Sequence, residues 1–190
     1  MNKREELSKI AREIEACDEC REQGSGRAVT GEGNPDAAVM FVGEAPGKEE
    51  AKTGRPFVGR SGRLLRSLIR EIGLTEDEVF ITNPVYYLPK RGTPSRESIR
   101  HSRAHFMKQL GAVDPEIVVL LGSVAGLAAL GSPVAITKQH GSFVHHEGRT
   151  YFISFHPSAA LRFPGTKELF EEDFKKLKAL IRAEAQRHES

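Results

Sequence analysis

The sequence has few cysteines, no long apolar run and little net charge, and each shortage narrows the possible functions. No apolar stretch approaches the roughly 20 residues that a membrane-spanning helix needs. The first residues, MNKREELSKI, are charged and lack the apolar core of a signal peptide. We therefore expect a cytoplasmic protein without a membrane partner. The two cysteines, Cys17 and Cys20, form a single C-x-x-C, which is half of a metal site or one short-loop disulfide.

The overall composition indicates a folded protein. Charged residues make up 28% of the chain and hydrophobic residues 38%, which is typical of globular and not of disordered proteins. A length of 190 residues suits one buried core, so we predict a single domain over 1–190 and a monomer. The formal net charge of +2 is too small to indicate nucleic-acid binding unless the basic residues cluster.

Hydrophobic periodicity predicts alternating helices and strands. Apolar runs predict strands over 38–42, 79–83 and 115–122, and shorter strands over 141–146 and 150–155. Amphipathic patterns predict helices over 3–16, 61–72, from Ser95 to about Leu110, over 123–130 and from Thr166 onward. The glycine-rich segment 21–36 is predicted to be a loop. The arginines at 60, 63, 66 and 70 are expected to point mostly outward. His140, His145 and His146 show no ligand spacing with the cysteines and are expected on the surface.

The stretch Gly43–Gly59, GEAPGKEEAKTGRPFVG, connects a predicted strand to a predicted helix. In a parallel sheet such connections lie at the carboxyl ends of the strands, where ligands bind and where glycines let backbone amides approach them. This connection carries two carboxylates, Glu44 and Glu50, and an aromatic ring, Phe57, that we expect to be exposed for stacking on a flat ligand. The sequence therefore predicts a binding site here.

Three predicted strand ends carry different polar side chains: Glu44, Asn83 and His156. If the strands are parallel neighbours, these ends share one crevice with Phe57 as its wall. An asparagine can read the edge of a base while an aromatic ring stacks on it. A histidine can donate a hydrogen bond to a developing oxyanion, and a carboxylate can favour a sugar cation or orient a water. Together these residues favour a hydrolase that excises a base.

The same motifs resemble a known family. GEAPG, with Glu50 six residues past Glu44, then GRPFVG, TN at a strand end and HPSA near the C-terminus are similar to family 4 uracil-DNA glycosylases, the thermostable iron-sulfur type. The resemblance covers nearly the whole chain. It implies an α/β fold, a three-layer αβα sandwich around a central four-stranded parallel sheet. It also implies removal of uracil from DNA by hydrolysis, which leaves an abasic site.

Individual roles follow from the resemblance. Glu44 contributes to catalysis, Glu50 supports it, and His156 stabilises the leaving uracil anion. The backbone at Ala45 helps to hold the uracil, Phe57 stacks on it and Asn83 reads its edge. For the DNA, the HPSA and Leu161–Pro164 segments supply Ser158, Leu161 and Arg162, with the latter segment entering the minor groove. From their position near the pocket, Arg60 and Arg63 are placed to meet phosphates.

The sequence departs from the family at its cofactor. The family carries two further cysteines that complete a 4Fe-4S cluster, and here those positions fall on Tyr87 and near Ser102, with His101 beside it. Two cysteines cannot supply four thiolates. A substituted cluster, a zinc bound with a histidine, a Cys17–Cys20 disulfide and an empty site packed by Tyr86 and Tyr87 all remain open. We favour the site without a cluster, and we expect the chemistry to need no cofactor.

A non-turnover module that binds or traps uracil-DNA is the alternative function. Trapping relatives of this fold carry an inserted basic loop with a histidine nucleophile. The corresponding segment here, Leu88–Gly92, is short and has no histidine. Turnover is therefore the preferred prediction.

Overall fold

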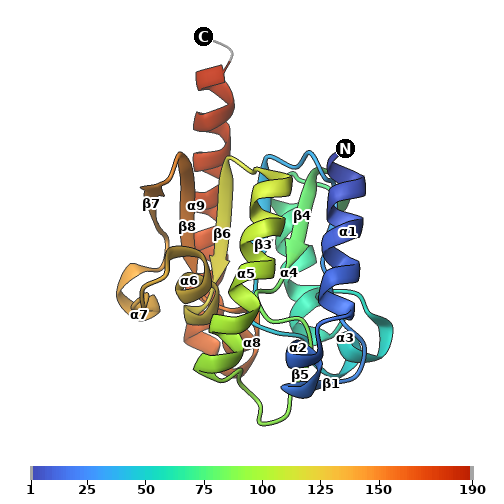
Figure 1. The fold of residues 1–190 in the computed structure, drawn as a ribbon. Helices are drawn as coiled ribbons and strands as arrows, with labels where there is room; N and C mark the ends of the chain where they lie inside the picture. Colours follow the sequence, from blue (N-terminus) through green and yellow to red (C-terminus); the bar gives the residue numbers. More distant parts are fainter. Residues whose placement is uncertain (1, 189–190) are drawn as a thin grey trace.

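The computed structural model describes residues 2–188 and contains a six-stranded central sheet (Figure 1). Its order is β2 (Glu32–Gly33), β4 (Val79–Thr82), β3 (Val39–Val42), β6 (Ile117–Leu121), β8 (Arg149–Ser154) and β7 (Ser142–His146). The four strands β4, β3, β6 and β8 are mutually parallel. The predicted four-stranded parallel sheet is thus present, and antiparallel strands β2 and β7 extend it at its edges.

Alternating side chains of the central strand β3 supply two hydrophobic cores, one on each face of the sheet. Val39 and Phe41 pack with α4 (Arg60–Glu71) and α9 (Pro164–His188). Met40 and Val42 pack with α5 (Arg96–Val113) and α6 (Ser123–Leu130). Figure 1 shows these helix pairs on opposite faces, which confirms the predicted αβα sandwich. Because both faces are covered, β3 and β6 are buried along their whole length.

The helix bounds follow local capping signals. Helix α1 (Lys3–Glu15) begins at Asn2, which forms a capping box with Glu5, and it packs against α5. Helix α5 begins after the N-cap Ser95, as predicted, and ends at Asp114 in a left-handed conformation. The shorter helical elements are α2 (Asp18–Glu22), α3 (Lys48–Thr53), η1 (Glu76–Glu78), α7 (Ile136–Gln139) and α8 (Pro157–Arg162).

The prediction that 21–36 is only a loop is wrong. The segment contains the end of α2, the two-residue strand β1 (Gly24–Ser25), and β2. Strand β1 pairs with β5 (Leu88–Pro89), while β2 pairs with β4. Two-residue strands are too short to leave a periodic pattern in the sequence. At Gly33 the strands approach so closely that a Cβ atom would lie 2.1 Å from the Val79 carbonyl oxygen.

Two side chains predicted on the surface are buried or paired instead. Arg66 is 8% exposed and donates hydrogen bonds to the backbone carbonyls of Pro56 and Phe57, just before α4. His140 Nδ1 lies 2.9 Å from Asp173 Oδ1, and the other Asp173 oxygen accepts a hydrogen bond from Ser154. The partners are distant in sequence, so helical periodicity alone could not identify them. His145 and His146 are exposed on β7, as predicted.

Within residues 2–188, no helix combines the length and apolar character needed to cross a bilayer.

Candidate functional site

A cavity of about 260 Å³ lies where the parallel strands end. Glu44 follows β3 and Asn83 follows β4, while His156 comes two residues after β8. The cavity is lined by Glu44, Ala45, Pro46, Gly47, Glu50, Phe57, Ser61, Asn83, Leu88, Gly92, His156 and Ser158. The structure thus brings together all of the residues predicted to act on or bind uracil, although their individual roles stay predictions.

Asn83 presents an unsatisfied polar atom at this cavity. Its side chain is 2% exposed, and within residues 2–188 its Oδ1 atom has no hydrogen-bond partner. Leaving a buried acceptor unpaired costs about 1–3 kcal/mol. A ligand N–H group would remove that cost. Gly43 makes room for this arrangement, because a Cβ atom there would lie 2.4 Å from Asn83 Oδ1.

Phe57 lines the cavity from a buried position, so the prediction of an exposed ring is wrong. The side chain is 5% exposed, and its ring centroid lies 6.0 Å from that of His156. The backbone of Phe57 is left-handed, with φ of 52°, and it packs against helix α4 at Gly62. A Cβ atom on Gly62 would lie 2.0 Å from the Phe57 carbonyl. This close packing draws the ring into the core and leaves only part of it at the cavity.

Arg66 holds the unusual backbone at Phe57 in place. Its Nε donates to the Phe57 carbonyl at 3.0 Å, and its Nη2 donates to the Pro56 carbonyl at 2.8 Å. Glu32 accepts from the same Nη2 at 2.6 Å, which neutralises the buried guanidinium. Sequence reasoning missed this positioning residue because it sits among three other arginines of α4, all of which are exposed.

The two carboxylates at the cavity differ in their surroundings. Glu50 Oε1 accepts hydrogen bonds from the backbone N–H groups of Val58 and Gly59, at 2.8 and 2.7 Å, so Glu50 organises the turn that precedes α4. The Glu44 carboxylate is half-buried and has no hydrogen-bond or ion-pair partner within the described chain. Burial raises the pKa of Glu44 above its ordinary value. Glu44 is therefore the carboxylate that is free to act on a ligand or a water.

His156 is held as a neutral hydrogen-bond donor. Burial lowers the pKa of its imidazole to about 4, against the opposing charge of Glu50, so the ring is uncharged at neutral pH. The Ser158 backbone N–H donates to His156 Nδ1 at 3.2 Å, and the Ser158 hydroxyl lies 2.7 Å from the same atom. Because Nδ1 accepts, the single proton resides on Nε2. That N–H can donate to an oxygen on a bound ligand.

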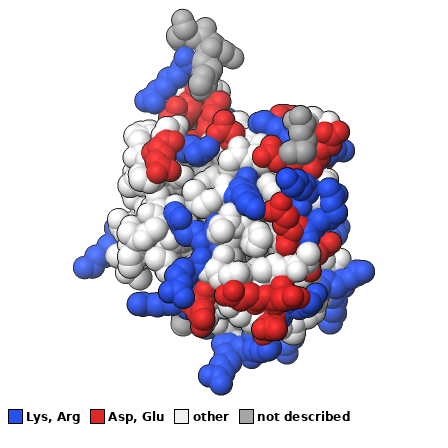
Figure 2. Space-filling view, in the orientation of Figure 1, with Lys and Arg blue, Asp and Glu red and all other residues white. Residues whose placement is uncertain are grey.

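The residues predicted to meet DNA lie on the surface near the cavity. Arg60 and Arg63 are exposed at the start of α4, and Arg63 also donates to the Val58 carbonyl at 3.2 Å. Helix α8 carries the exposed Ser158 and Arg162, and Leu161 is 41% exposed. Figure 2 shows basic side chains projecting along the lower edge of the molecule, where the parallel strands end, with acidic side chains just above them.

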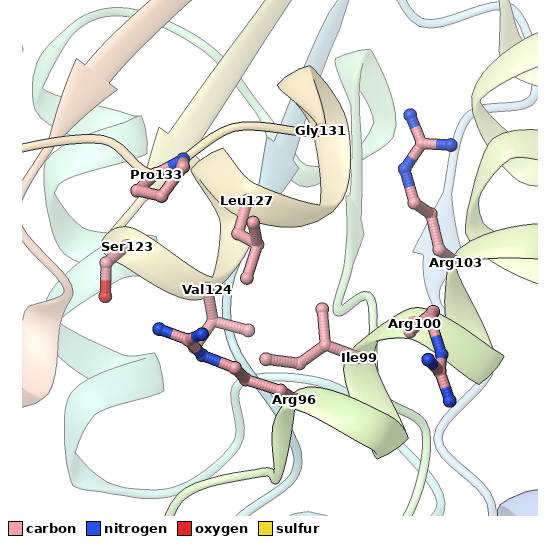
Figure 3. Close-up of a pocket in the computed structure, with 9 residues that line it drawn as sticks. All are labelled: Arg96, Ile99, Arg100, Arg103, Ser123, Val124, Leu127, Gly131 and Pro133. Carbon is pink, nitrogen blue, oxygen red and sulfur yellow. The ribbon is translucent and has the colours of Figure 1, made fainter.

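A second, larger hollow of about 390 Å³ lies between α5 and α6 (Figure 3). Its lining is apolar except for Ser123 and three arginines, and it includes Arg96, Ile99, Arg100, Arg103, Val124 and Leu127. Within the described chain, no carboxylate, amide side chain or imidazole lines this hollow. It lacks the groups needed to read and release a base, so the smaller cavity is the better candidate.

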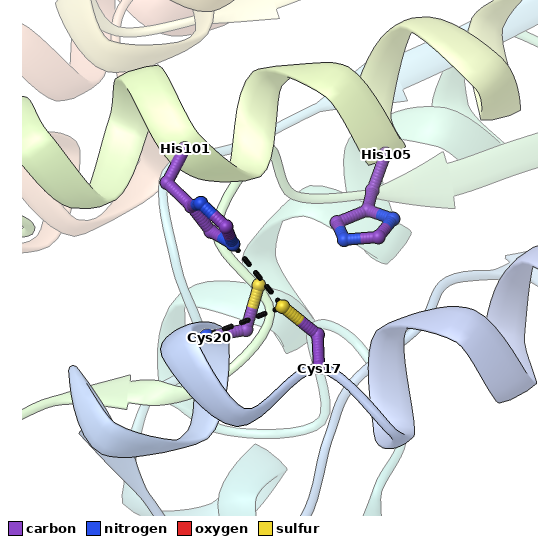
Figure 4. Close-up of side chains that lie close together, drawn as sticks. All are labelled: Cys17, Cys20, His101 and His105. Carbon is purple, nitrogen blue, oxygen red and sulfur yellow. Dashed lines mark hydrogen bonds between the residues drawn. The ribbon is translucent and has the colours of Figure 1, made fainter.

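Four potential metal ligands gather at a separate place, between α2 and α5 (Figure 4). One donor atom from each of Cys17, Cys20, His101 and His105 lies within 4.8 Å of every other. Both cysteines are free thiols, and burial together with Cys17 raises the pKa of Cys20 to about 12. Sequence analysis named His101 but missed His105. The H-x-x-x-H spacing on a predicted helix is the signal that could have found it.

Tyr86 and Tyr87 pack beside these ligands, which is the packing that the empty-site alternative invoked. They belong to one buried cluster with Cys20 and the apolar face of α1. The Tyr86 ring stands edge-on to His105, with centroids 6.4 Å apart. The two buried tyrosines therefore pack against this cluster while the four donor atoms stay close to one another.

Comparisons with known proteins show which family the chain matches. Residues 30–178 match the family model described as the uracil DNA glycosylase superfamily. The chain is 40% identical to a type-4 uracil-DNA glycosylase of Sulfurisphaera tokodaii, with 92% of this chain and 84% of that protein aligned. It is 38% identical to a type-4 uracil-DNA glycosylase of Thermotoga maritima, over 97% of this chain and 100% of that protein. A type-5 uracil-DNA glycosylase of Pyrobaculum aerophilum is 32% identical over 70% of this chain and 66% of its own length.

Proposed function

Because the chain belongs to the uracil DNA glycosylase superfamily, we propose that it removes uracil from DNA, hydrolysing the bond between base and deoxyribose and leaving an abasic site. The protein acts as a single-domain monomer on the DNA inside the cell. The observation that carries the proposal is the buried, unpartnered Oδ1 of Asn83 in a cavity shared with Glu44, Phe57 and His156.

Asn83 recognises the uracil. Its Oδ1 accepts from the N3–H of the base, and its amide N–H donates to O4, so both polar groups of the side chain are used. Cytosine has no hydrogen on N3 and carries an amino group at C4, so it would leave both asparagine groups unpaired. The Phe57 ring stacks on the base, and the backbone at Ala45 supports its other edge. Uracil reaches the cavity only after it is flipped out of the DNA stack.

The reaction breaks the bond between N1 of uracil and C1′ of the sugar. The electron pair leaves with the base as a uracil anion, and the neutral His156 donates its Nε2 hydrogen bond to O2, where negative charge develops. Glu44 orients a water toward C1′ and accepts its proton as the new C–O bond forms. Glu50 keeps the turn before α4 in position. These steps use only residues of the cavity.

The DNA is bound by exposed side chains around the cavity. Arg60 and Arg63 contact phosphates, which makes the affinity fall as salt concentration rises. Ser158 and Arg162 contact the backbone beside the flipped nucleotide. Leu161 enters the minor groove and fills the space that the base leaves, since an apolar side chain there offsets part of the lost stacking.

Multiple-turnover excision tests the proposal. With uracil-containing oligonucleotide in excess, the wild-type protein should release many free uracils per molecule and leave alkali-labile strands, while a matched cytosine oligonucleotide stays intact. Asn83→Ala should lower kcat/KM about 1,000-fold or more, because both base-reading groups are lost. Asn34→Ala is the control, since Asn34 lies outside the cavity. Wild-type protein that binds the oligonucleotide but releases at most one uracil per molecule would contradict turnover and support the binding-module alternative.

A further inference from the structure

The cysteine and histidine pairs each have the spacing of a metal-binding half-site. Cys17 and Cys20 form a C-x-x-C in which Cys17 caps α2 and its Sγ accepts from the Cys20 N–H at 3.4 Å. His101 and His105 are four residues apart on α5, so their side chains lie on the same face, one turn from each other. The spacings C-x₂-C and H-x₃-H are those of zinc sites with two cysteines and two histidines.

The 4Fe-4S cluster that the resemblance to family 4 uracil-DNA glycosylases implies does not fit these residues. The chain has two cysteines in all, and the positions of the missing ligands hold Tyr87 and, near the second, Ser102. The donor atoms are also too close together. Cys17 Sγ and His101 Nε2 are 3.1 Å apart, and all four donors lie within 4.8 Å of one another. A core of several irons and sulfides would have to separate its protein ligands more widely than a single ion does.

A single ion matches this spacing. Zinc bonds of about 2.3 Å to sulfur and about 2.0–2.1 Å to nitrogen, arranged tetrahedrally, place neighbouring ligand atoms about 3.3–3.8 Å apart. Two thiolates and two imidazoles form a donor set that zinc prefers. We propose that Cys17, Cys20, His101 and His105 bind one Zn²⁺ ion.

A carboxylate orients one of the histidine ligands. Glu19 Oε1 lies 3.0 Å from His101 Nδ1, while the other nitrogen of that ring, Nε2, faces Cys17. A carboxylate that accepts from the outer nitrogen of a metal-bound histidine fixes the ring and raises its basicity. Glu19 is therefore a positioning residue for the zinc site.

The site has a structural role. Four protein ligands complete a tetrahedral shell, which leaves no position for a substrate or water. The ion joins α2 to α5, two helices far apart in the sequence, and none of its ligands lines the uracil cavity. The zinc site is consequently independent of the proposed excision chemistry, and metal content can be tested without measuring activity.

Metal and sulfide analysis of the full-length protein tests the proposal. Protein purified under reducing conditions from medium that supplies equal zinc and iron should contain one zinc per chain and no acid-labile sulfide. After metal removal, added Co²⁺ should produce the visible absorption of a tetrahedral site with thiolate ligands. Iron with labile sulfide, absence of bound metal, or a Cys17–Cys20 disulfide that persists with reductant would each overturn it.

Ligand variants identify the residues. His105→Ala should lower Zn²⁺ affinity more than about 100-fold, measured by competition with a chromophoric chelator. Glu19→Gln, a surface change that does not threaten folding, should lower it about 10-fold. His146→Ala removes an exposed histidine on β7 and should leave affinity unchanged. Equal affinity for Zn²⁺ in wild type and in His105→Ala and Glu19→Gln would contradict the proposed ligands.

Discussion

The cavity lined by Glu44, Asn83 and His156 and the cysteine–histidine cluster both gather polar atoms. They differ in whether those atoms have partners. In the cavity lining, the buried Asn83 Oδ1 atom and the half-buried Glu44 carboxylate have no partner within residues 2–188. In the cluster, the four donor atoms face one another, with His101 also paired to Glu19. Unpaired groups around a space suit a ligand that enters and leaves. Donors that converge on one point suit an ion that stays.

The two regions also differ in how much unusual local structure they require. The cavity requires a left-handed Phe57, tight packing at Gly43 and Gly62, and the buried Arg66. The cluster requires only two short spacings and the approach of α2 to α5. If this contrast is right, damage to one region should spare the other.

Among the changes that compare the two regions, the largest effect on kcat is expected from His156→Ala. Removing the donor to the leaving base should lower kcat about 100- to 1,000-fold. The zinc content should stay at one per chain, because His156 is not in the cluster. Single-turnover excision and elemental analysis on the same preparation measure both. A variant with nearly normal kcat would show that His156 does not stabilise the leaving group.

The pH dependence of the excision rate should follow the ionisation of Glu44. Glu44 must be ionised to accept a proton, and burial raises its pKa, so excision should begin to fall at a pH above the ordinary glutamate value of 4.5. Below that point the rate should drop about tenfold per pH unit, while His156 stays neutral until about pH 4.

Glu44→Gln is the matched control for this profile. The variant should be slow and should lack the acid limb over the pH range in which circular dichroism shows it folded. An unchanged acid limb in Glu44→Gln would assign the titration to another group.

Arg66→Lys should test whether the cavity depends on its preorganised wall. Lysine keeps the charge but cannot donate to the Pro56 and Phe57 carbonyls and to Glu32 with one planar group. We expect kcat/KM to fall about tenfold as the ring shifts, and the free energy of unfolding to fall by about 1–3 kcal/mol. Arg70→Lys, at an exposed position of the same helix, is the control. Equal effects of the two changes would remove Arg66 from the positioning role.

Leu161→Ala should lower excision from duplex DNA more than excision from single-stranded DNA. A duplex loses stacking when uracil flips out, and Leu161 offsets that loss, so excision from duplex DNA should fall about fivefold. Excision from a single strand should change by less than about twofold. Leu169→Ala removes a similarly exposed leucine from α9 and should alter neither. Equal losses on both substrates would argue against insertion into the groove.

The smallest effect on excision is expected from Cys17→Ser. Loss of a zinc ligand should leave kcat/KM within about twofold at a temperature where the protein is folded, because the ligands lie outside the cavity. The free energy of unfolding should fall by about 4 kcal/mol when free Zn²⁺ exceeds the wild-type Kd 1,000-fold. Thermal unfolding with and without chelator measures this. A large loss of excision would show that the two regions are coupled.

Much of the fold was predictable because its signals are local. The apolar runs of β3, β4 and β6 and the capping residue Ser95 appear directly in the sequence, and polar residues after strands indicated the shared cavity. The short strands β1 and β2, the burial of Phe57 and the pairing of His140 with Asp173 were not predictable. Each depends on contacts between segments far apart in the chain, which no local pattern records.

The sequence by itself determined which chemical groups end each parallel strand, and therefore that an acid, an amide and an imidazole would meet at one edge of the sheet. Only the tertiary structure decided how those groups are held: which carboxylate is free, which nitrogen of His156 carries the proton, and which arginine turns inward. The same holds for the cluster, where the sequence supplied two half-sites and the packing of α2 against α5 brought them together. The physical reason is that residue identity sets what a group can do, while burial and distance set its charge state and its partners.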